Sequence, residues 1–232
     1  MNRYITRGIV LRRTDFAEAD RIVTFITPDH GKIRAIAKGV RKPKSKLAGA
    51  IELFSVSDLT ILVGKGEINT LMSGRLAMHY GQIVKDTQRT DAAYEAIKLI
   101  NKVTEDQPEE AYFNLLAQTL ESLNDSSVDP QLTALWFNMQ LLKLAGHMPN
   151  LRTDASGKKL AEDKMYYFEL ERMCFRTSPQ RPGEFSSDTI KFLRLGFGAQ
   201  RPNVLQRVKG AAELAVQAAP LIQAMLAAHL RI

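Results

Sequence analysis

Hydrophobic and polar residues alternate with a period of two through most of the first eighty positions, which is typical of β-strands. Residues 4–13 and 20–27 are rich in Ile, Val and Thr, and residues 32–38 alternate again. Pro28 and Gly31 lie between the second and third of these runs and favour a tight turn. The second and third runs should therefore form a hairpin.

Two further strands are predicted over residues 51–63 and 67–72, separated by the glycines at positions 64 and 66. Five short strands in the first third of the chain predict a small closed barrel. The OB-fold is the five-stranded barrel most used to bind oligonucleotides, and an SH3-like barrel is the alternative.

From about residue 81 the apolar positions recur every three to four residues, as they do in helices. This spacing predicts helices within residues 93–103 and 112–123. A third helix should begin with Asp129 as its N-cap and Pro130 as its first residue, and end at Gly146.

The rest of the chain gives a less regular pattern. Residues 147–185 are rich in Pro and Gly and are predicted to be irregular, whereas helical spacing resumes over 187–195 and from Val204 onward. Pro220 should kink or divide the last helix. The predicted fold class is α+β, with an OB-fold barrel over residues 1–80 followed by a mostly α-helical domain over 81–232.

The excess of positive over negative charge is confined to the predicted barrel. The 232 residues have a formal net charge of +7, and residues 1–80 contain 14 Lys and Arg against 7 Asp and Glu, whereas residues 81–232 contain 18 of each. A basic module beside a neutral one is expected of a protein that binds a polyanion such as DNA. The alternative is a charged surface that only keeps the domain soluble.

No common catalytic motif is found in the sequence. The chain has no phosphate-binding G-x-x-x-x-G-K-[ST] loop, no H-E-x-x-H and no G-x-S-x-G, and its four histidines are far apart. We therefore expect a protein that is not an enzyme and needs no cofactor. Cys174 is the single cysteine and no apolar run is long enough to span a bilayer, so we expect a cytoplasmic address and no membrane contact.

The strongest candidate site is the segment from Lys38 to Lys46, which carries five basic residues in nine and no acidic residue. Its Gly, Pro and Ser residues predict a loop, from which the cationic groups can reach a phosphate backbone. A solvated loop that binds nothing specific is the alternative. Four aromatic residues of this module could stack on unpaired bases or fill the core, namely Tyr4, Phe16, Phe25 and Phe54.

The same residues carry a family resemblance. The segments 7–11, 18–23, 31–39 and 46–50, followed by Phe54, closely resemble the N-terminal domain of the bacterial RecO family of recombination mediators. The similarity is densest over residues 4–72 and continues more loosely through the helices.

The resemblance implies an OB-fold that binds single-stranded and duplex DNA. It also implies annealing of complementary strands coated by single-strand-binding protein and, together with RecR, loading of RecA, without catalysis or a nucleotide cofactor. The candidate DNA-binding residues are Lys32, Arg34, Lys38, Arg41, Lys42, Lys44 and Lys46.

The sequence departs from the family at a zinc motif. Many relatives carry two C-x-x-C pairs after the central helix, and aligning Gly157 with their glycine places Thr153 and Ser156 at the first pair and Cys174 and Thr177 at the second. Hydroxyl groups are poor zinc ligands, so no structural zinc is expected.

Two other functions remain open. A ribosome- or RNA-associated OB-fold protein would share the barrel and the charge. An interaction hub would use the neutral helical domain, where an apolar groove with a few Lys or Arg could take the acidic, apolar tail of single-strand-binding protein. The sequence does not locate that groove. As a DNA-binding protein the chain is expected at the nucleoid.

Overall fold

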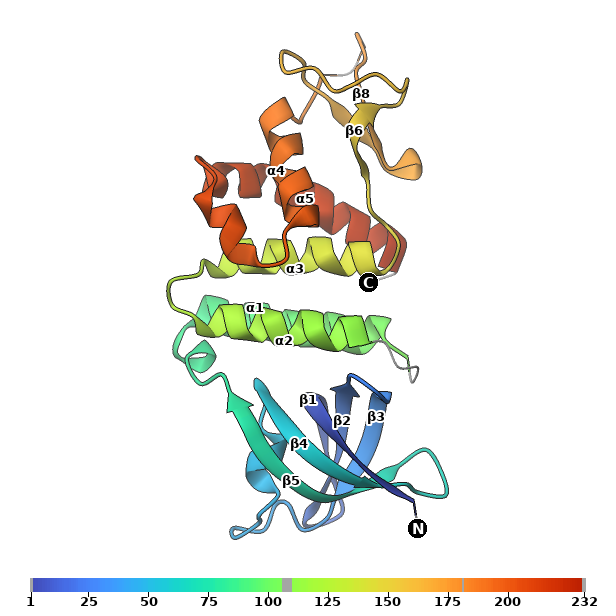
Figure 1. Cartoon of the computed structure of the whole chain (residues 1–232), viewed down its shortest axis with the longest axis vertical. Coiled ribbons are helices and arrows are strands. Elements are labelled where there is room, and N and C mark those ends of the chain that lie inside the picture. The colour runs from blue at the N-terminus through green and yellow to red at the C-terminus, as the bar shows by residue number, and fades with distance from the viewer. Residues whose placement is uncertain (1, 106–109, 181, 231–232) are drawn as a thin grey trace. The chain divides into compact units, whose positions relative to one another are not determined.

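The computed structural model describes residues 2–105, 110–180 and 182–230, and Figure 1 shows its helices and strands. The chain divides into two compact units, Met1–Ser126 and Ser127–Ile232. The first contains a barrel followed by the helices α1 and α2, and the second contains a small sheet and the helices α3, α4 and α5. This α+β organisation confirms the predicted fold class.

Five strands close the barrel in the order β1-β2-β3-β5-β4. The strands are β1 (Arg3–Phe16), β2 (Asp20–Thr27), β3 (Gly31–Ala37), β4 (Ser55–Leu62) and β5 (Asn69–His79). Neighbouring strands are antiparallel, except that β3 and β5 are parallel. This Greek-key arrangement is the predicted OB-fold, and the hairpin of β2 and β3 is confirmed.

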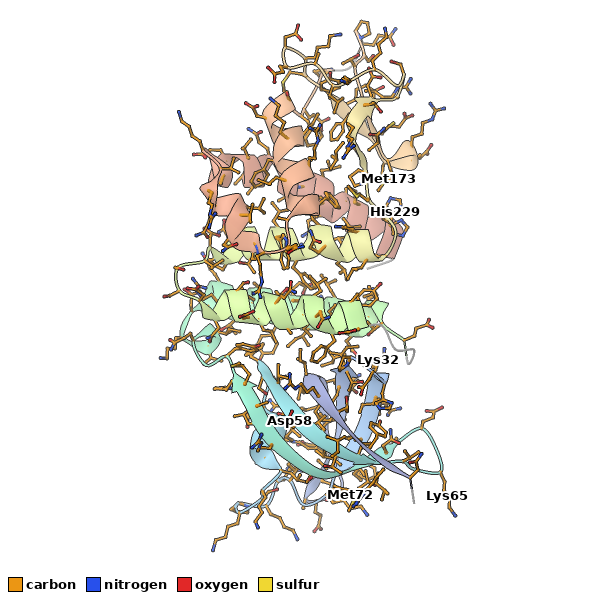
Figure 2. All side chains as sticks on the ribbon, in the orientation of Figure 1. Lys32, Asp58, Lys65, Met72, Met173 and His229 are labelled. Atoms are coloured by element: carbon orange, nitrogen blue, oxygen red, sulfur yellow. The ribbon has the colours of Figure 1, made fainter. Side chains whose placement is uncertain are left out.

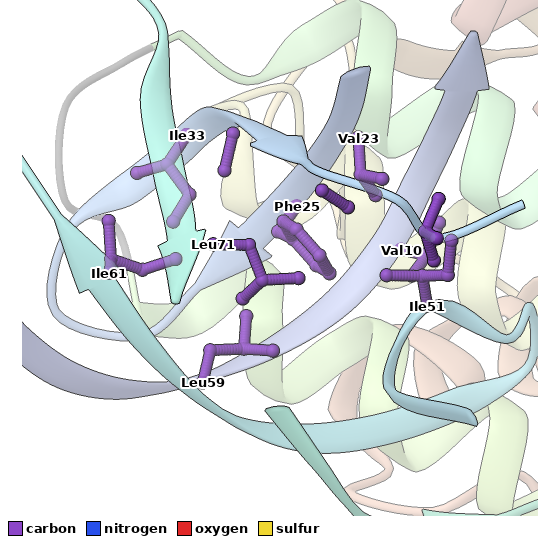
Figure 3. Close-up of a cluster of buried hydrophobic side chains, with 11 residues drawn as sticks. Val10, Val23, Phe25, Ile33, Ile51, Leu59, Ile61 and Leu71 are labelled. Atoms are coloured by element: carbon purple, nitrogen blue, oxygen red, sulfur yellow. The ribbon is translucent and has the colours of Figure 1, made fainter. Parts of the chain in front are cut away.

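The interior of the barrel is apolar because each strand turns alternate side chains inward. Val23 and Phe25 of β2 are completely buried in one apolar cluster with Ala35 of β3 and Ile61 of β4. Figure 3 shows Val23, Phe25 and Ile61 in this cluster. The residue between Val23 and Phe25 points outward. The strand pattern thus divides the barrel into an apolar interior and an outer face, and α1 and α2 contact part of that face.

Two strand boundaries differ from the predicted ones. Residues 51–63 do not form one strand, because Ile51 ends a 3-10 helix (Ala48–Ile51) and Phe54 adopts a left-handed backbone with φ 54° before β4 begins. Strand β5 continues to His79, well past the predicted end at residue 72. Its pairing with β4 shifts register at two bulges, which removes the simple alternation from the sequence.

The helices α1 (Thr87–Val103) and α2 (Glu110–Asn124) complete the first unit, in which α1 contacts β1 and α2 contacts β2. Asp86 caps α1 by accepting a hydrogen bond from the backbone N–H of Arg89. The guanidinium of Arg89 in turn donates to the carbonyl of Leu123 in the last turn of α2 and to those of Asp125 and Ser126 just after it. The compact unit therefore extends beyond residue 80.

The second unit is built around α3 (Pro130–Leu144), which contacts α4 (Ser187–Gly198) and α5 (Ala211–Leu230). The predicted N-cap is confirmed, since the carboxylate of Asp129 accepts hydrogen bonds from two backbone N–H groups of the first turn at 2.7 and 2.9 Å. Gly146 follows the helix with φ 82°, as a C-terminal glycine does. Trp136 of α3 is buried, and its indole N–H donates a hydrogen bond to the carbonyl of Ala199.

The segment 147–185 is more regular than its sequence predicts. It contains a three-stranded sheet in the order β6-β8-β7, with β6 (Asn150–Asp154), β7 (Tyr167–Glu169) and β8 (Cys174–Arg176). Strands of three to five residues are too short to show a period in the sequence. Buried Phe175 packs edge-on against Phe168 and Phe185 and gives this sheet its core.

Helix α5 continues through Pro220, so the expectation that this proline could divide the last helix is wrong. Apolar residues on both sides of the proline, including Ala218, Leu221 and Ile222, are buried and hold the helix in place despite the missing N–H. By length and composition alone, residues 211–229 could also cross a membrane, with mean hydropathy 1.4. The buried stripe of α5 packs against α3 and α4, as a core helix does.

Candidate nucleic-acid interface

The basic loop, residues 38–46, is a series of turns fixed to the end of the β1–β2 hairpin. Gly39 has φ 64° and donates its N–H to the carboxylate of Asp20 at 2.7 Å, and the N–H of Arg41 donates to the carbonyl of Ala19 at 2.9 Å. Val40 is buried in the barrel core. Because its base is held at three points, the loop presents its side chains from a fixed position.

Four lysines of the basic loop point into solvent without an ionic partner. Lys38, Lys42, Lys44 and Lys46 are exposed and form no ion pair with any residue that the structure describes. Arg41 is also exposed, but its guanidinium lies 3.7 Å from the carboxylate of Asp15. The loop thus offers four unneutralised ammonium groups and one partly neutralised guanidinium.

Asp15 organises the arginines beside the loop. Its carboxylate accepts a 2.7 Å hydrogen bond from Nε of Arg21, and this bond, with the positive charges of Arg21, Arg41 and Arg13, holds the pKa of Asp15 below its usual value. The carboxylate therefore stays ionised at neutral pH and attracts Arg41 away from incoming phosphates. Sequence reasoning did not foresee this pairing, because Asp15 is 26 positions from Arg41.

Lys32 and Arg34, the two candidates on β3, have different surroundings. The ammonium of Lys32 donates to the carbonyls of Asn101 and Thr104 at 3.1 and 2.5 Å and so caps the last turn of α1. Lys32 is therefore a structural residue in this fold, and we do not retain it as a phosphate ligand. Arg34 is exposed, and its nearest carboxylate, that of Glu67, lies 3.9 Å away.

A groove of about 440 Å³ runs over the outer face of β1, β2 and β3. In register, Arg12 lies opposite Thr24, and Thr24 lies opposite Arg34, so one row across three strands carries a guanidinium at each end. Among the residues that the structure describes, no acidic one lines this strand groove. Its lining residues are Arg12, Thr14, Ile22, Thr24, Lys32, Arg34 and Asn101.

The strand groove adds residues that the sequence did not single out. The alternation of inward and outward side chains along a strand could have identified Arg12, Thr14 and Thr24. On β2, for example, Val23 and Phe25 point inward, so the residue between them must point outward. On β1 the bulge between Val10 and Arg12 interrupts this alternation, so it cannot be followed in the sequence. Only the register of the barrel brings the two arginines onto one row.

Of the four aromatic candidates, one is accessible for stacking. Phe25 and Phe54 are buried in the core, and Tyr4 is half-buried and stacks on His30 with ring centroids 3.8 Å apart. Phe16 is 48% exposed at the end of β1 and pairs with Asp20, the residue that holds the basic loop. An accessible ring thus lies next to the residue that anchors the basic loop.

Comparison with known proteins finds a matching family model for each half of the chain. The family model described as "Recombination protein O N terminal" matches residues 1–80, and that described as "Recombination protein O C terminal" matches residues 85–232. The chain belongs to the RecO family. The resemblance found in the sequence is therefore confirmed, and no comparison supports the ribosome- or RNA-associated alternative.

Curated relatives of this RecO-family chain carry the name "DNA repair protein RecO". The protein of Dehalococcoides mccartyi strain CBDB1 is 34% identical over 196 residues, which is 82% of this chain and 76% of the relative. That of Bifidobacterium longum subsp. infantis is 37% identical over 155 residues (66% and 65%), and that of Bacillus cytotoxicus is 34% identical over 179 residues (75% and 71%).

In this RecO-family chain a carboxylate organises the turn where the resemblance places the first cysteine pair. Asp154 accepts hydrogen bonds from Oγ of Ser156 at 2.7 Å and from the backbone N–H groups of Ser156 and Lys158. The bond from Ser156 is the main reason that the pKa of Asp154 lies below its usual value. Hydrogen bonds thus hold the turn together.

Of the four positions that align with the family's cysteines, Cys174 carries a thiol and the other three carry hydroxyl groups. The hydroxyl of Thr153 accepts a hydrogen bond from the amide of Asn150, and Ser156 and Thr177 line a small polar pocket beside Arg176. Cys174 is buried, and burial raises the pKa of its thiol. No group of three or more His, Cys, Asp or Glu side chains suited to a metal occurs in the described part of the chain. The absence of zinc stays a prediction.

Proposed function

We propose that this chain is a recombination mediator of DNA repair that binds DNA through its barrel and anneals complementary strands coated by single-strand-binding protein. Membership of the RecO family supports the role in repair and recombination. The observation that carries the DNA-binding surface is the set of four exposed, unpaired ammonium groups at Lys38, Lys42, Lys44 and Lys46 on a loop fixed to the barrel.

The basic loop and the strand groove form one candidate surface. Strand β3 leads from Arg34 in the groove directly into Lys38 at the start of the loop, a distance of about 13 Å at 3.3 Å per residue. The lysine and arginine side chains of this surface would contact phosphates, and such contacts carry no sequence information. Bases of a bound strand are therefore left free to pair with a second strand.

Annealing follows from charge neutralisation on such a surface. Two complementary strands repel each other through their phosphates, and lysines that replace condensed counterions lower this repulsion where the strands meet. Phe16 can hold an unpaired base by stacking close to the loop. No step of this activity breaks or forms a covalent bond, so we propose a non-enzymatic mediator that needs no cofactor.

Annealing of coated strands tests the proposal directly. Complementary oligonucleotides saturated with single-strand-binding protein should anneal faster when this chain is added, and equal-length RNA strands should gain less. A rate that the chain leaves unchanged would remove the annealing function. A stronger effect on RNA would restore the RNA-associated alternative.

A groove in the second unit fits the tail of single-strand-binding protein. It has a volume of about 520 Å³ and lies between α4 and the start of α5, lined by apolar side chains including Phe192, Leu195 and Leu214. Lys209 lies on its rim and forms no ion pair with a described residue, whereas Lys191 is held by Glu162 at 2.7 Å. The carboxylates of Asp188 and Glu213 also line the groove, so the support for binding an acidic, apolar tail comes from the apolar floor and from the ammonium of Lys209.

Titration with a synthetic peptide of that tail tests the groove. Leu195→Glu and Lys209→Glu should each weaken binding about tenfold or more, because they place a negative charge where the tail is negative. Leu144→Glu is the matched control, since Leu144 is equally exposed on α3 and does not line the groove. Equal loss in the control variant would show that the groove is not the site.

The remaining partners follow from the family. We propose that the chain acts with RecR to load RecA at gaps, and that it works at the nucleoid in the cytoplasm. Reconstituted loading of RecA on coated single strands, with each protein omitted in turn, tests whether the chain and RecR are both needed. Full loading without the chain would exclude the role.

A further inference from the structure

Three side chains with metal-binding atoms meet in the second unit, although they come from distant parts of the sequence. His147 follows α3, Met173 follows the 3-10 helix Leu170–Arg172, and His229 lies in the last turn of α5. The rings of His147 and His229 are stacked, with centroids 4.5 Å apart and an angle of 17° between planes. Nε2 of His229 lies 3.1 Å from Sδ of Met173 (Figure 2).

The backbone fixes two of these side chains in place. Gly146 has φ 82°, and the N–H of His147 donates to the carbonyl of Leu142 at 2.8 Å, so His147 is held at the end of α3. The N–H of Asn150 donates to the carbonyl of Met173, also at 2.8 Å. The connection from His147 to Asn150 is therefore tied to the turn that carries Met173.

Met173 has an unusual backbone conformation. Its φ of 51° and ψ of 42° are left-handed, a conformation that side chains other than those of Gly, Asn and Asp rarely adopt. Such residues often mark places where a side chain must be aimed at a particular point. Here the thioether is brought into contact with His229.

We propose that His147, Met173 and His229 form a binding site for a soft monovalent metal ion, copper(I). A thioether with two imidazoles is a soft ligand set, which selects copper(I) over the hard cations that prefer carboxylates. With the metal–nitrogen and metal–sulfur bond lengths known for zinc, an imidazole nitrogen and a sulfur bound to one ion at a tetrahedral angle lie about 3.5 Å apart. The 3.1 Å between nitrogen and sulfur needs to widen by only a few tenths of an ångström.

Binding requires a tautomer change and a ring rotation, and no redox step. In the metal-free protein Nε2 of His229 donates its proton toward the sulfur, so on binding this proton must move to Nδ1 and leave the Nε2 lone pair for the ion. The stacked ring of His147 must turn about its Cβ–Cγ bond, because the lone pairs of stacked rings run parallel.

The ion would add a direct link between three elements that lie far apart in the sequence and already touch through packing and a backbone hydrogen bond. It would tie the end of α3 and the last turn of α5 to the turn before β8. This site is separate from the positions of the family's cysteine pairs, because none of its three ligands belongs to the set Thr153, Ser156, Cys174 and Thr177. A bound ion should therefore stabilise the small sheet without any thiolate.

Competition with the colorimetric chelator bicinchoninate under anaerobic conditions tests the site, with copper(I) as the probe and the full chain as the protein. We expect one ion per chain, and Met173→Leu and His229→Gln should each weaken binding at least tenfold. Met72→Leu and His79→Gln are matched controls, since both residues are exposed on β5. No binding at one ion per chain, or equal losses in the controls, would overturn the proposal.

The buried thiol of Cys174 needs its own control, because thiolates bind copper(I) tightly. Binding should persist in Cys174→Ala. If that variant loses the ion while Met173→Leu keeps it, the thiol is the site and the proposal is wrong. To separate binding from folding, silver(I) can be added to protein with 13C-labelled methionine methyl groups, where the signal of Met173 should shift and that of Met72 should not. An unshifted Met173 signal in a folded protein would also refute the site.

Discussion

The basic loop makes a quantitative prediction about salt. Replacing Lys38, Lys42, Lys44 and Lys46 together by alanine removes the four ammonium groups that have no ion-pair partner among the described residues. Arg41 is left in place because Asp15 already neutralises part of its charge. The variant should fold normally, since none of the four side chains is buried.

The expected change follows from counterion release. Each phosphate contact contributes about 0.7 to the slope of log affinity against log salt on single strands and about 0.9 on duplex DNA. If all four lysines contact phosphates, the slope should become shallower by about 2.8 on single strands and about 3.6 on duplex. Between about 50 and 200 mM salt, the four contacts should account for about 50-fold of the affinity that the unchanged protein loses on single strands.

Fluorescence anisotropy with labelled oligonucleotides of several sequences measures this slope. Affinity should fall by the same factor for every sequence, because phosphate contacts do not read bases. The matched control replaces four other exposed lysines, Lys65, Lys85, Lys102 and Lys164, and so has the same net charge. A slope that is unchanged in the loop variant, or that changes equally in the control, would refute the assignment of the loop.

Other residues give sharper tests of single contacts. Phe16→Ala should weaken binding of single strands by about 1–3 kcal/mol and leave duplex binding almost unchanged, because only unpaired bases stack; equal losses on both would exclude stacking. Lys32→Met should lower the free energy of unfolding by about 1–3 kcal/mol, since the carbonyls at the end of α1 lose their cap, and should leave the salt slope as it was. Asp15 has a pKa below its usual value in the folded state, so its pairing with Arg21 stabilises the protein above the unfolded-state pKa and is lost as pH falls through the folded one; in Arg21→Ala its titration midpoint by NMR should return toward the usual value. Elemental analysis of purified protein should find no stoichiometric zinc, and one zinc per chain would contradict the reading of the cysteine positions.

Local patterns in the sequence were enough for the fold class and for the basic loop. Alternation with a period of two identified strands in the barrel, and turn residues such as Gly31 identified the hairpin, because both signals depend on neighbours in the chain. The charge excess and the absence of acidic residues from 38–46 located the strongest candidate surface in the same way. Capping of α3 by Asp129 was equally local and was confirmed.

Features that depend on contacts between distant residues could not be read from the chain. The row of Arg12, Thr24 and Arg34 exists only through strand register, which a bulge in β1 shifts by one residue. Lys32 looked like a phosphate ligand until the fold placed its ammonium on the end of α1, some seventy residues away. The sequence by itself determined the barrel strands in outline, the main helices and the charged loop, but not the short strands β6, β7 and β8. The tertiary structure alone decided which charges stay free, because a partner 20 to 80 positions away leaves no periodic mark in the sequence.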